Sequence, residues 1–340
     1  MSISEIPAVQ QGAELYRKVY NKEISEECFY HKHFDNPNAL SESFIIELQN
    51  DTPVAMRWLM KLNFCYDGNI VSGVQSSDDA VLDEARGLLF LKMRKKTLNI
   101  LQQNSIDFEY GCFYPGTAME IAEKFGEKNI VNLYMARLFL NERTHRWKRF
   151  DISIPAFVRK VLIDKRTKRF ADLSQKDLTI DISEKCQFGD EDYKKLNSAS
   201  CFQIERNQSY YNWKTSGIDN LSIITARKDN ELYGFLIVKK ESDYGIVVDW
   251  DLFGENKIET LASMLLPICR DYQYLDVPSL NIESGEMKLF TALGSKDMSS
   301  LWAPICICAN VINDGLSSII CDSKKWKHRL IDADYFLNGE

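Results

Sequence analysis

The sequence predicts an α+β protein of three layers. We expect two domains in tandem, each with a mixed, mostly antiparallel sheet flanked by helices. A chain of 340 residues exceeds one ordinary hydrophobic core, so two domains are the expected number. One order of elements (helix, three strands, helix, strand, helix, strand) can be traced twice along the chain. The content of 45% hydrophobic and 27% charged residues is typical of a globular protein.

The first half shows helical and strand periodicity in turn. Asp67-Gly68 separates two apolar runs and favours a tight hairpin, so the three strands are predicted to form an antiparallel meander. A turn-rich loop is expected around Cys28–Asn38 because of Asn36-Pro37-Asn38. The elements expected are a helix over 9–21, strands over 43–50, 53–66 and 69–82, a helix over 87–103, a strand over 108–115, a helix ending at 126, and a strand over 129–140.

The second half repeats this order after a basic connector. The predicted division is a first domain over 1–142, a connector over 143–184, and a second domain over 185–340. The elements expected there are a helix over 190–200, strands over 220–228, 231–240 and 245–253, a helix over 257–272, a strand over 278–284, a helix over 285–293, and a strand over 301–312.

Charge and composition exclude several classes of protein. The net charge of −7 argues against general nucleic-acid binding. The ten Lys and Arg residues between Arg143 and Arg169 indicate a solvated connector or, less commonly, a patch facing a phosphorylated ligand or an anionic surface. The sequence shows neither an apolar run of membrane-spanning length nor a signal peptide, and its nine scattered cysteines suggest reduced thiols. We expect a cytoplasmic protein with no stable membrane insertion and no metal.

The most informative stretch runs from Asp78 to Phe90 and reads DDAVLDEARGLLF. Phe113-Tyr114-Pro115 and Lys124-Phe125-Gly126 follow downstream. Together with the element order, these residues resemble the GNAT superfamily of acyl-CoA-dependent N-acyltransferases, and the tandem form looks most like members of bacterial surface-polysaccharide pathways. In that family, a loop of the form Gln/Arg-x-x-Gly-x-Gly/Ala between strand and helix binds the pyrophosphate of CoA.

The resemblance implies a site for acetyl-CoA, as a co-substrate, at this junction. The start of a helix offers N–H groups without internal partners, Gly87 allows close approach, and Arg86 adds a positive charge. Arg94 and Lys95 could meet the outer phosphates. Taken alone, Arg-Gly before a helix is also an ordinary helix start. The implied cofactor-binding residues are Val81, Glu84, Ala85, Arg86, Gly87, Leu88 and Leu89.

The resemblance also implies catalytic roles. Asp78 occupies the place of the base that takes the proton of the amine, with Asp79 and Glu109 as rivals. A backbone N–H near Val81 would polarise the thioester carbonyl. Tyr114, at the mouth of the following strand, is the candidate acid for the leaving thiolate. Edge or turn solvation is the alternative reading of both aspartates.

Residues predicted to contact the acceptor amine lie in both halves. They are His31, His33, Asp79, Tyr210 and Trp213. The spacing of His31 and His33 without a third ligand makes an ordinary loop histidine more common than a metal ligand. Aromatic residues such as Tyr210 and Trp213 more often belong to a core.

The second junction, over 248–257, has no Arg-Gly pair and contains Asp249 and Asp251. Repulsion between these carboxylates and a phosphate predicts a poor CoA site. The second domain is therefore predicted to be a degenerate partner that shapes the acceptor cleft.

The function expected is transfer of an acetyl or short acyl group from acyl-CoA to a primary amine by direct attack. The acceptor is a small molecule, for which a nucleotide-linked amino sugar is one candidate. A Fem-like aminoacyl transferase is the rival enzyme, although a charge of −7 suits tRNA poorly. A non-catalytic binding or scaffold protein is the third reading. This hypothesis is supported by the acidic second junction and by Leu89, which occupies a position where the family has Gly or Ala.

Overall fold

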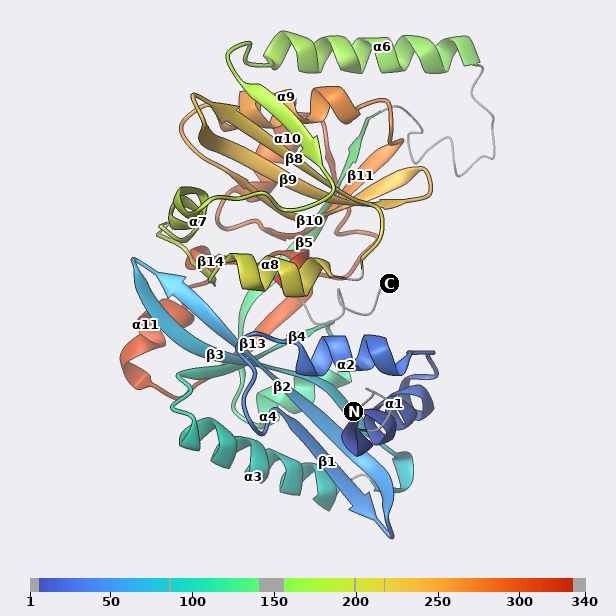
Figure 1. The fold of residues 1–340 in the computed structure, drawn as a ribbon, viewed down its shortest axis with the longest axis vertical. Helices are drawn as coiled ribbons and strands as arrows, with labels where there is room; N and C mark the ends of the chain where they lie inside the picture. Colours follow the sequence, from blue (N-terminus) through green and yellow to red (C-terminus); the bar gives the residue numbers. More distant parts are fainter. Residues whose placement is uncertain (1–5, 86, 141–155, 199, 217, 333–340) are drawn as a thin grey trace.

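The computed structural model describes residues 6–85, 87–140, 156–198, 200–216 and 218–332. Within them the chain forms one 14-stranded sheet of mostly antiparallel strands, with helices packed on it (Figure 1). The predicted fold class, a mixed sheet flanked by helices, is confirmed. The two predicted sheets are continuous with each other. None of the described helices is long and apolar enough to cross a membrane.

The first half contains most of the expected elements. The hairpin predicted at Asp67-Gly68 is confirmed, because both residues have positive φ angles, 47° and 77°, as a type I′ turn requires. The elements are α1 (Pro7–Tyr20), α2 (Glu26–Phe34), β1 (Phe44–Gln49), β2 (Thr52–Tyr66), β3 (Asn69–Val81), the 3₁₀ turn η2 (Asp83–Ala85), α3 (Leu88–Gln103), β4 (Phe108–Phe113), α4 (Thr117–Lys124) and β5 (Lys128–Phe139).

The second half adds several short elements to the expected ones. They include β7 and β14, which extend the sheet beyond β2. The elements are α6 (Ala156–Leu173), β6 (Thr179–Ser183), α7 (Asp190–Asn197), β7 (Phe202–Ile204), α8 (Gln208–Thr215), β8 (Leu221–Lys228), β9 (Glu231–Glu241), β10 (Tyr244–Leu252), α9 (Lys257–Ile268), β11 (Tyr274–Asn281), α10 (Glu286–Ala292), β12 (Lys296–Asp297), β13 (Ile305–Val311), η3 (Asp314–Leu316), α11 (Ser317–Ile320), η4 (Ser323–Lys325), β14 (Trp326–Lys327) and η5 (Leu330–Asp332).

The two halves exchange strands at the centre of the sheet. The strand order is β14-β7-β2-β3-β4-β13-β5-β11-β10-β9-β8-β6, with β1 paired to β2 and β12 to β5. Strand β13, from the second half, lies between β4 and β5 of the first. Strand β5 in turn pairs with β11 of the second half. Each half therefore completes its sheet with a strand from the other, which fixes the two halves relative to each other.

The predicted loop over Cys28–Asn38 is largely wrong, because α2 covers Glu26–Phe34. Its signal was present in the sequence. Ser25 accepts a hydrogen bond from the N–H of Cys28 at 3.1 Å, and Glu26 and Glu27 lie in the positively polarised first turn. The Asn-Pro-Asn turn only ends the helix.

The predicted connector contributes structure to the second half. Helix α6 packs on α9, and β6 pairs with β8 to form the far edge of the sheet (Figure 1). The first part of the connector, residues 143–155, falls outside the described residues. Four of the ten cationic residues lie in that part, and the other six lie in α6. Hydrophobic cores lie on each side of the sheet, for example beneath α1 and beneath α3 in the first half.

Candidate functional site

Two pairs of parallel strands separate toward their carboxyl ends. Strands β3 and β4 pair only over 73–75 with 108–110, although both continue beyond this point. Strands β10 and β11 pair only over 245–246 with 275–276. A helix follows β3 and β10 in each case. Ligands of sheets with parallel strands bind outside the carboxyl ends, at such points of separation. These two junctions are the candidate sites.

At the first junction, the chain turns sharply before α3. The N–H of Ala85 donates to the carbonyl of Leu82 at 2.9 Å, so one amide of the predicted pyrophosphate loop is used within its own turn. Gly87 precedes α3 with φ 101°, and no side chain caps the helix. An added Cβ at Gly87 would meet nothing within 4 Å. The start of α3 is therefore open to an approaching ligand.

The remaining residues of the predicted loop have mixed surroundings. Glu84 is exposed next to Asp83, so two carboxylates precede the helix. Leu89 is half-buried and packs against the core beneath α3. Val81 lies opposite Ala55 at the end of the β2–β3 ladder. Arg86 and the side chain of Leu88 are outside the described part of the chain.

Asp78, the predicted base, lies in a β-bulge with φ 51° and is held by Lys32 and His33. Its carboxylate accepts hydrogen bonds from Lys32 Nζ at 3.0 Å and His33 Nε2 at 2.7 Å. Burial alone would raise the pKa of Asp78, but the charge of Lys32 and the hydrogen bond from His33 hold it well below its usual range. A carboxylate with so little affinity for a proton is a poor general base. Its surroundings favour a structural role.

The rival bases belong to a network of charges beneath α3. Arg57 donates to both carboxylate oxygens of Asp79, at 2.6 and 2.5 Å. Glu109, which is fully buried, accepts from Arg94 and, at 2.5 Å, from Ser76 Oγ. Both carboxylates are thus engaged by arginines. Arg94, predicted to meet a phosphate, is itself 7% exposed.

The sequence reasoning missed Glu127, which follows α4 and borders this network. Burial, followed by the charge of Glu109, raises the pKa of Glu127 to about 7. Its Oε2 atom is buried and has no hydrogen-bond partner among the described residues. No local pattern distinguishes this glutamate from its neighbours, because the shift arises from residues brought together by the fold.

Tyr114, the predicted acid, lies where the two halves meet. Its side chain is 61% exposed and lines a cavity of about 360 Å³. The cavity lies against β5, β10 and β11, and includes Trp302 and Leu330. Its polar lining includes Arg137 and Asp276, which pair at 2.6 Å. An exposed hydroxyl beside an inter-half cavity is accessible to a substrate.

The predicted acceptor contacts are mostly engaged within the protein. His31 Nε2 lies 2.9 Å from the carbonyl oxygen of Trp213, and the indole of Trp213 donates to the carbonyl of His31 at 3.2 Å. These contacts join α2 to α8. Tyr210 is buried and donates to Asp332 at 2.6 Å. His33 is fully buried against Asp78. The surroundings of these four residues therefore favour packing between and within the halves.

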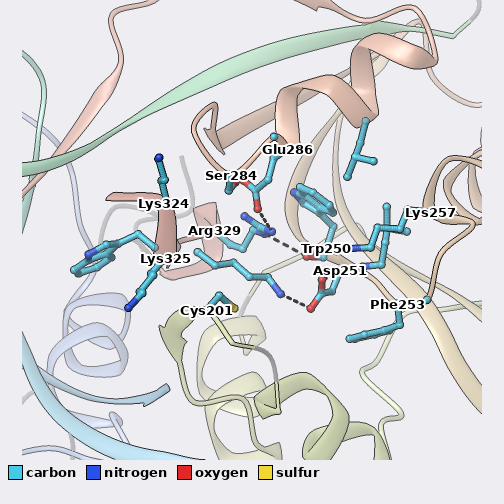
Figure 2. Close-up of a pocket in the computed structure, with 16 residues that line it drawn as sticks. Cys201, Trp250, Asp251, Phe253, Lys257, Ser284, Glu286, Lys324, Lys325 and Arg329 are labelled. Atoms are coloured by element: carbon cyan, nitrogen blue, oxygen red, sulfur yellow. Dashed lines mark hydrogen bonds and ion pairs between the residues drawn. The ribbon is translucent and has the colours of Figure 1, made fainter. Parts of the chain in front are cut away.

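The second junction borders a cavity of about 470 Å³ (Figure 2). Three segments and Cys201 line it. The segments are the end of β10 with the start of α9, the start of α10, and residues 324–329. The residues that line it are Cys201, Trp250, Asp251, Leu252, Phe253, Gly254, Lys257, Ser284, Gly285, Glu286, Leu289, Lys324, Lys325, Trp326, Lys327 and Arg329. Cations outnumber carboxylates in this set by five to two.

The two aspartates that argued against phosphate binding are neutralised here. Asp249 is buried, accepts from Tyr211 at 2.8 Å, and lies 3.5 Å from Arg206. Asp251 does line the cavity, but Lys327 pairs with it (Figure 2). The expected repulsion depended on unpaired carboxylates, so it does not apply at this junction.

The gap between β10 and β11 is filled by side chains. Arg329, which is 1% exposed, donates to Glu286 Oε1 at 2.7 Å and to the carbonyl of Trp250 at 3.2 Å. Its guanidinium also lies 4.2 Å from the centre of the Trp250 ring. Glu286 accepts in turn from the N–H of Asn281 at 2.9 Å. A ligand in the cavity therefore meets a closed wall at the sheet.

Among the described residues, no group of three His, Cys, Asp or Glu side chains is arranged to hold a metal ion. No protein-family model and no curated protein matches the sequence.

The fold resembles solved structures of acyltransferases. A GCN5-related N-acetyltransferase from Anabaena variabilis superposes with a TM-score of 0.65 and 11% identity, over 91% of this chain and 71% of that one. One from Kribbella flavida gives 0.62 and 10%, over 92% and 70%. The N-myristoyltransferase of Saccharomyces cerevisiae with bound myristoyl-CoA gives 0.53 and 11%, over 91% and 81%. At these identities the likeness establishes a shared fold.

Proposed function

We propose that this chain is an acyl-CoA-dependent N-acyltransferase that moves an acetyl or short acyl group to a primary amine. The observation that supports this most directly is the separation of β3 from β4 beside the uncapped start of α3. The strand pairing ends before the carboxyl ends of β3 and β4, and the helix start beside them supplies N–H groups for a diphosphate. Solved structures of this fold include N-acetyltransferases and a myristoyltransferase with bound myristoyl-CoA.

We place the acyl donor in the first half. In the second half, Arg329 and Glu286 fill the space between β10 and β11, so the arm of CoA could not pass there. The first junction has an open helix start at Gly87. The acidic Asp83 and Glu84 oppose a diphosphate there, and the N–H groups of the helix start must outweigh them.

The reaction requires bond changes that Tyr114 could assist. The nitrogen lone pair of the amine forms a bond to the thioester carbonyl carbon, giving a tetrahedral intermediate. The carbon–sulfur bond then breaks, the Tyr114 hydroxyl gives its proton to the thiolate, and the phenolate takes the proton from nitrogen. The products are an amide and free CoA. Tyr114 suits this role because its side chain is exposed beside the inter-half cavity, which we assign to the acceptor.

For Asp78, Tyr210 and Trp213, the contacts in the structure favour roles other than those predicted from the sequence. The contacts of Asp78 with Lys32 and His33 favour a structural role over that of a base. Tyr210 and Trp213 are buried and hydrogen-bonded within the protein, so we assign them to packing between and within the halves.

A non-catalytic binding protein is the second candidate. It is favoured by the engagement of Asp78, Asp79 and Glu109 with cations, which leaves none of the three predicted bases available. A protein that binds acyl-CoA without transferring the acyl group would show saturable binding and no release of CoA.

The test combines calorimetry and turnover on the full chain. Acetyl-CoA, myristoyl-CoA and unacylated tRNA are titrated in turn, and the release of free CoA thiol is then followed against a panel of amines and amino-sugar nucleotides. We expect binding of an acyl-CoA and amine-dependent release of CoA. Binding without release would favour the binding protein. Binding of tRNA and of neither acyl-CoA would overturn the donor assignment in favour of a Fem-like enzyme.

A further inference from the structure

Aromatic rings form a large part of the wall of the cavity between the two halves. They come from β5, β10 and β11, from the residue after β4 and from the segment before β13, and are Tyr114, Tyr134, Tyr244, Tyr274 and Trp302. Most of the other residues that line the cavity are apolar. The volume of about 360 Å³ lies near the lower end of the range for small-molecule sites, roughly 300–1,000 Å³. The cavity therefore suits a small ligand with an apolar part.

Part of this wall is a stack of flat groups on the sheet. The rings of Tyr244 and Tyr274 lie 4.9 Å apart at an angle of 14°, and the guanidinium of Arg137 lies 4.0 Å from the centre of the Tyr274 ring. These residues come from the adjacent strands β10, β11 and β5. Two hydrogen bonds to Asp276, at 2.6 and 2.7 Å, hold Arg137 in place. Since these contacts exist before a ligand arrives, little side-chain freedom is lost when one binds.

Two further rings of the same cavity are exposed to solvent. The side chain of Trp302 is 54% exposed, and that of Tyr114 is 61% exposed. Exposed aromatic side chains gathered at a cavity are typical of a binding site. A ligand ring that packs on Trp302 would remove apolar surface of both partners from water.

The cavity has no surplus of charge. Among the described residues that line it, the charged ones are Arg137 and Asp276, and they pair with each other. The negative charges of a nucleotide diphosphate would find no unpaired cation among these residues. A sugar would need hydrogen-bond partners for its hydroxyl groups, and most of the lining is apolar. The lining therefore disfavours a nucleotide-linked sugar as the ligand of this cavity.

A buried hydroxyl group without a partner also borders the cavity. Ser279 is 2% exposed, and its Oγ atom has no hydrogen-bond partner among the described residues. The residue lies in the irregular part of β11 after Val277, with φ 61°, a conformation that is uncommon outside glycine. Strained backbone and unsatisfied polar groups both cost stability and are often found where a ligand binds. A hydrogen bond from a ligand would satisfy this oxygen.

We infer that the inter-half cavity binds a primary amine attached to an aromatic ring. The ring packs on Trp302 beside Tyr274, and the Oγ atom of Ser279 accepts a hydrogen bond from the amine. An aromatic ring gains more from such neighbours than an aliphatic ring of similar area, because aromatic pairs attract beyond the area that they bury. The inference rests on the proposed function in taking this cavity as the acceptor site, which Tyr114 also lines.

The experiment measures binding to the full chain by calorimetry. The probes are 2-phenylethylamine, 2-cyclohexylethylamine and UDP-glucosamine. The first two have the same ammonium group and rings of similar size, so the difference between their Kd values reports on aromatic packing and not on charge.

Each variant has a matched control. Trp302→Leu removes the aromatic ring, Trp302→Phe keeps one, and Leu301→Ala changes an exposed apolar neighbour that does not line the cavity. Ser279→Ala removes the hydroxyl at the cavity, and Ser295→Ala removes another buried hydroxyl whose oxygen has no partner among the described residues. All variants are first compared with the original chain by thermal unfolding.

We expect 2-phenylethylamine to bind about fivefold more tightly than 2-cyclohexylethylamine. Trp302→Leu should abolish this preference, whereas Trp302→Phe and Leu301→Ala should keep it. Ser279→Ala should raise the Kd of both amines by about fivefold, and Ser295→Ala should leave it unchanged. Equal binding of the two amines by the original chain, a preference that persists in Trp302→Leu, or binding of UDP-glucosamine alone would overturn the aromatic assignment. An unchanged Kd in Ser279→Ala would overturn the hydrogen bond.

Release of the CoA thiol in the presence of acetyl-CoA separates this inference from the proposed function. A preference for the aromatic amine without release of CoA would support the ligand class and reject the transferase. Release of CoA with non-aromatic amines or UDP-glucosamine, and none with 2-phenylethylamine, would support the transferase and overturn the inference.

Discussion

The junctions after β3 and after β10 have the same architecture and opposite electrostatics. In both, a parallel strand pair separates and an uncapped helix begins. The first junction is preceded by Asp83 and Glu84, whereas five cations and two carboxylates line the cavity at the second. The first has an open helix start, and the second has a filled gap between its strands. One fold repeated in a chain can therefore offer two different kinds of site.

Buried carboxylates stabilise the protein near each junction, and removing one should have the largest effect. Asp332 is fully buried and accepts from Arg206 at 2.5 and 3.0 Å and from Tyr210 at 2.6 Å. Asp332→Ala would leave the buried charge of Arg206 with only the longer contact to Asp249, at 3.5 Å. We expect the free energy of unfolding to fall by about 4 kcal/mol. Urea denaturation measures it.

The control for this prediction is Asp177→Ala, which removes an exposed ion pair with Lys228. We expect the denaturation midpoint of this variant to match that of the original chain. Equal midpoints for Asp332→Ala and Asp177→Ala would show that the network beneath the second junction contributes no stability.

Asp78 is the counterpart in the first half, and its substitution separates a structural role from a catalytic one. Asp78→Asn leaves Lys32, which is fully buried, without its carboxylate. We expect a loss of about 3 kcal/mol of unfolding free energy. A variant that keeps its full stability and yet loses turnover at every pH would instead support the base predicted from the sequence.

Glu127 should make the stability of the first half depend on pH. Its pKa rises from the ordinary 4.5 to about 7 through burial. Below pH 4.5 the carboxyl is protonated in both states. Between 4.5 and 7 the unfolded chain loses the proton while the folded chain keeps it, so the folded state loses stability as the pH rises. Glu127→Gln should therefore add about 2–3 kcal/mol at pH 8 and close to nothing at pH 4.

Denaturation of Glu127→Gln and of the original chain at the two pH values checks this prediction. The exposed Glu120 provides the matched control as Glu120→Gln. A gain for Glu127→Gln that is the same at pH 4 and pH 8 would mean that packing, and not ionisation, is responsible.

Tyr114 tests whether the cavity between the halves is the place of acyl transfer. Tyr114→Phe removes only the hydroxyl from a side chain that is 61% exposed. We expect kcat to fall about 100-fold, within the range for a lost general acid, with the Kd for acetyl-CoA unchanged. Tyr244→Phe, in the same cavity, is the control. An unchanged kcat in Tyr114→Phe would remove this residue from the mechanism.

The smallest expected effect concerns the approach to the start of α3. Gly87 has φ 101°, and Gly68 in the β2–β3 hairpin has φ 77°, with open space around both. Alanine at either position strains the backbone. Only Gly87→Ala should also weaken acyl-CoA binding, by about tenfold or 1.4 kcal/mol. Equal Kd values for Gly87→Ala and Gly68→Ala would move the donor away from the first junction.

The candidate sites were only partly accessible to sequence reasoning. The positions of both junctions followed from the strand and helix patterns of the sequence. Tyr114 was singled out from the sequence, but the cavity that it lines is formed by both halves and has no sequence pattern. The partners of Asp78 lie 45 and 46 residues away in a segment that was expected to be a loop. The pairing of Asp251 with Lys327 spans 76 residues. Charge neutralisation over such separations depends on the fold and leaves no local signal.

The sequence by itself determined the fold class, most of the order of the elements and the tight hairpin at Asp67-Gly68. Periodicity and turn chemistry act over a few residues and can be read in order along the chain. Only the tertiary structure decided that β13 completes the first half and β5 the second, and that the second junction is cationic. The physical reason is that strand exchange and charge compensation join residues far apart in sequence, whose contacts no local pattern specifies.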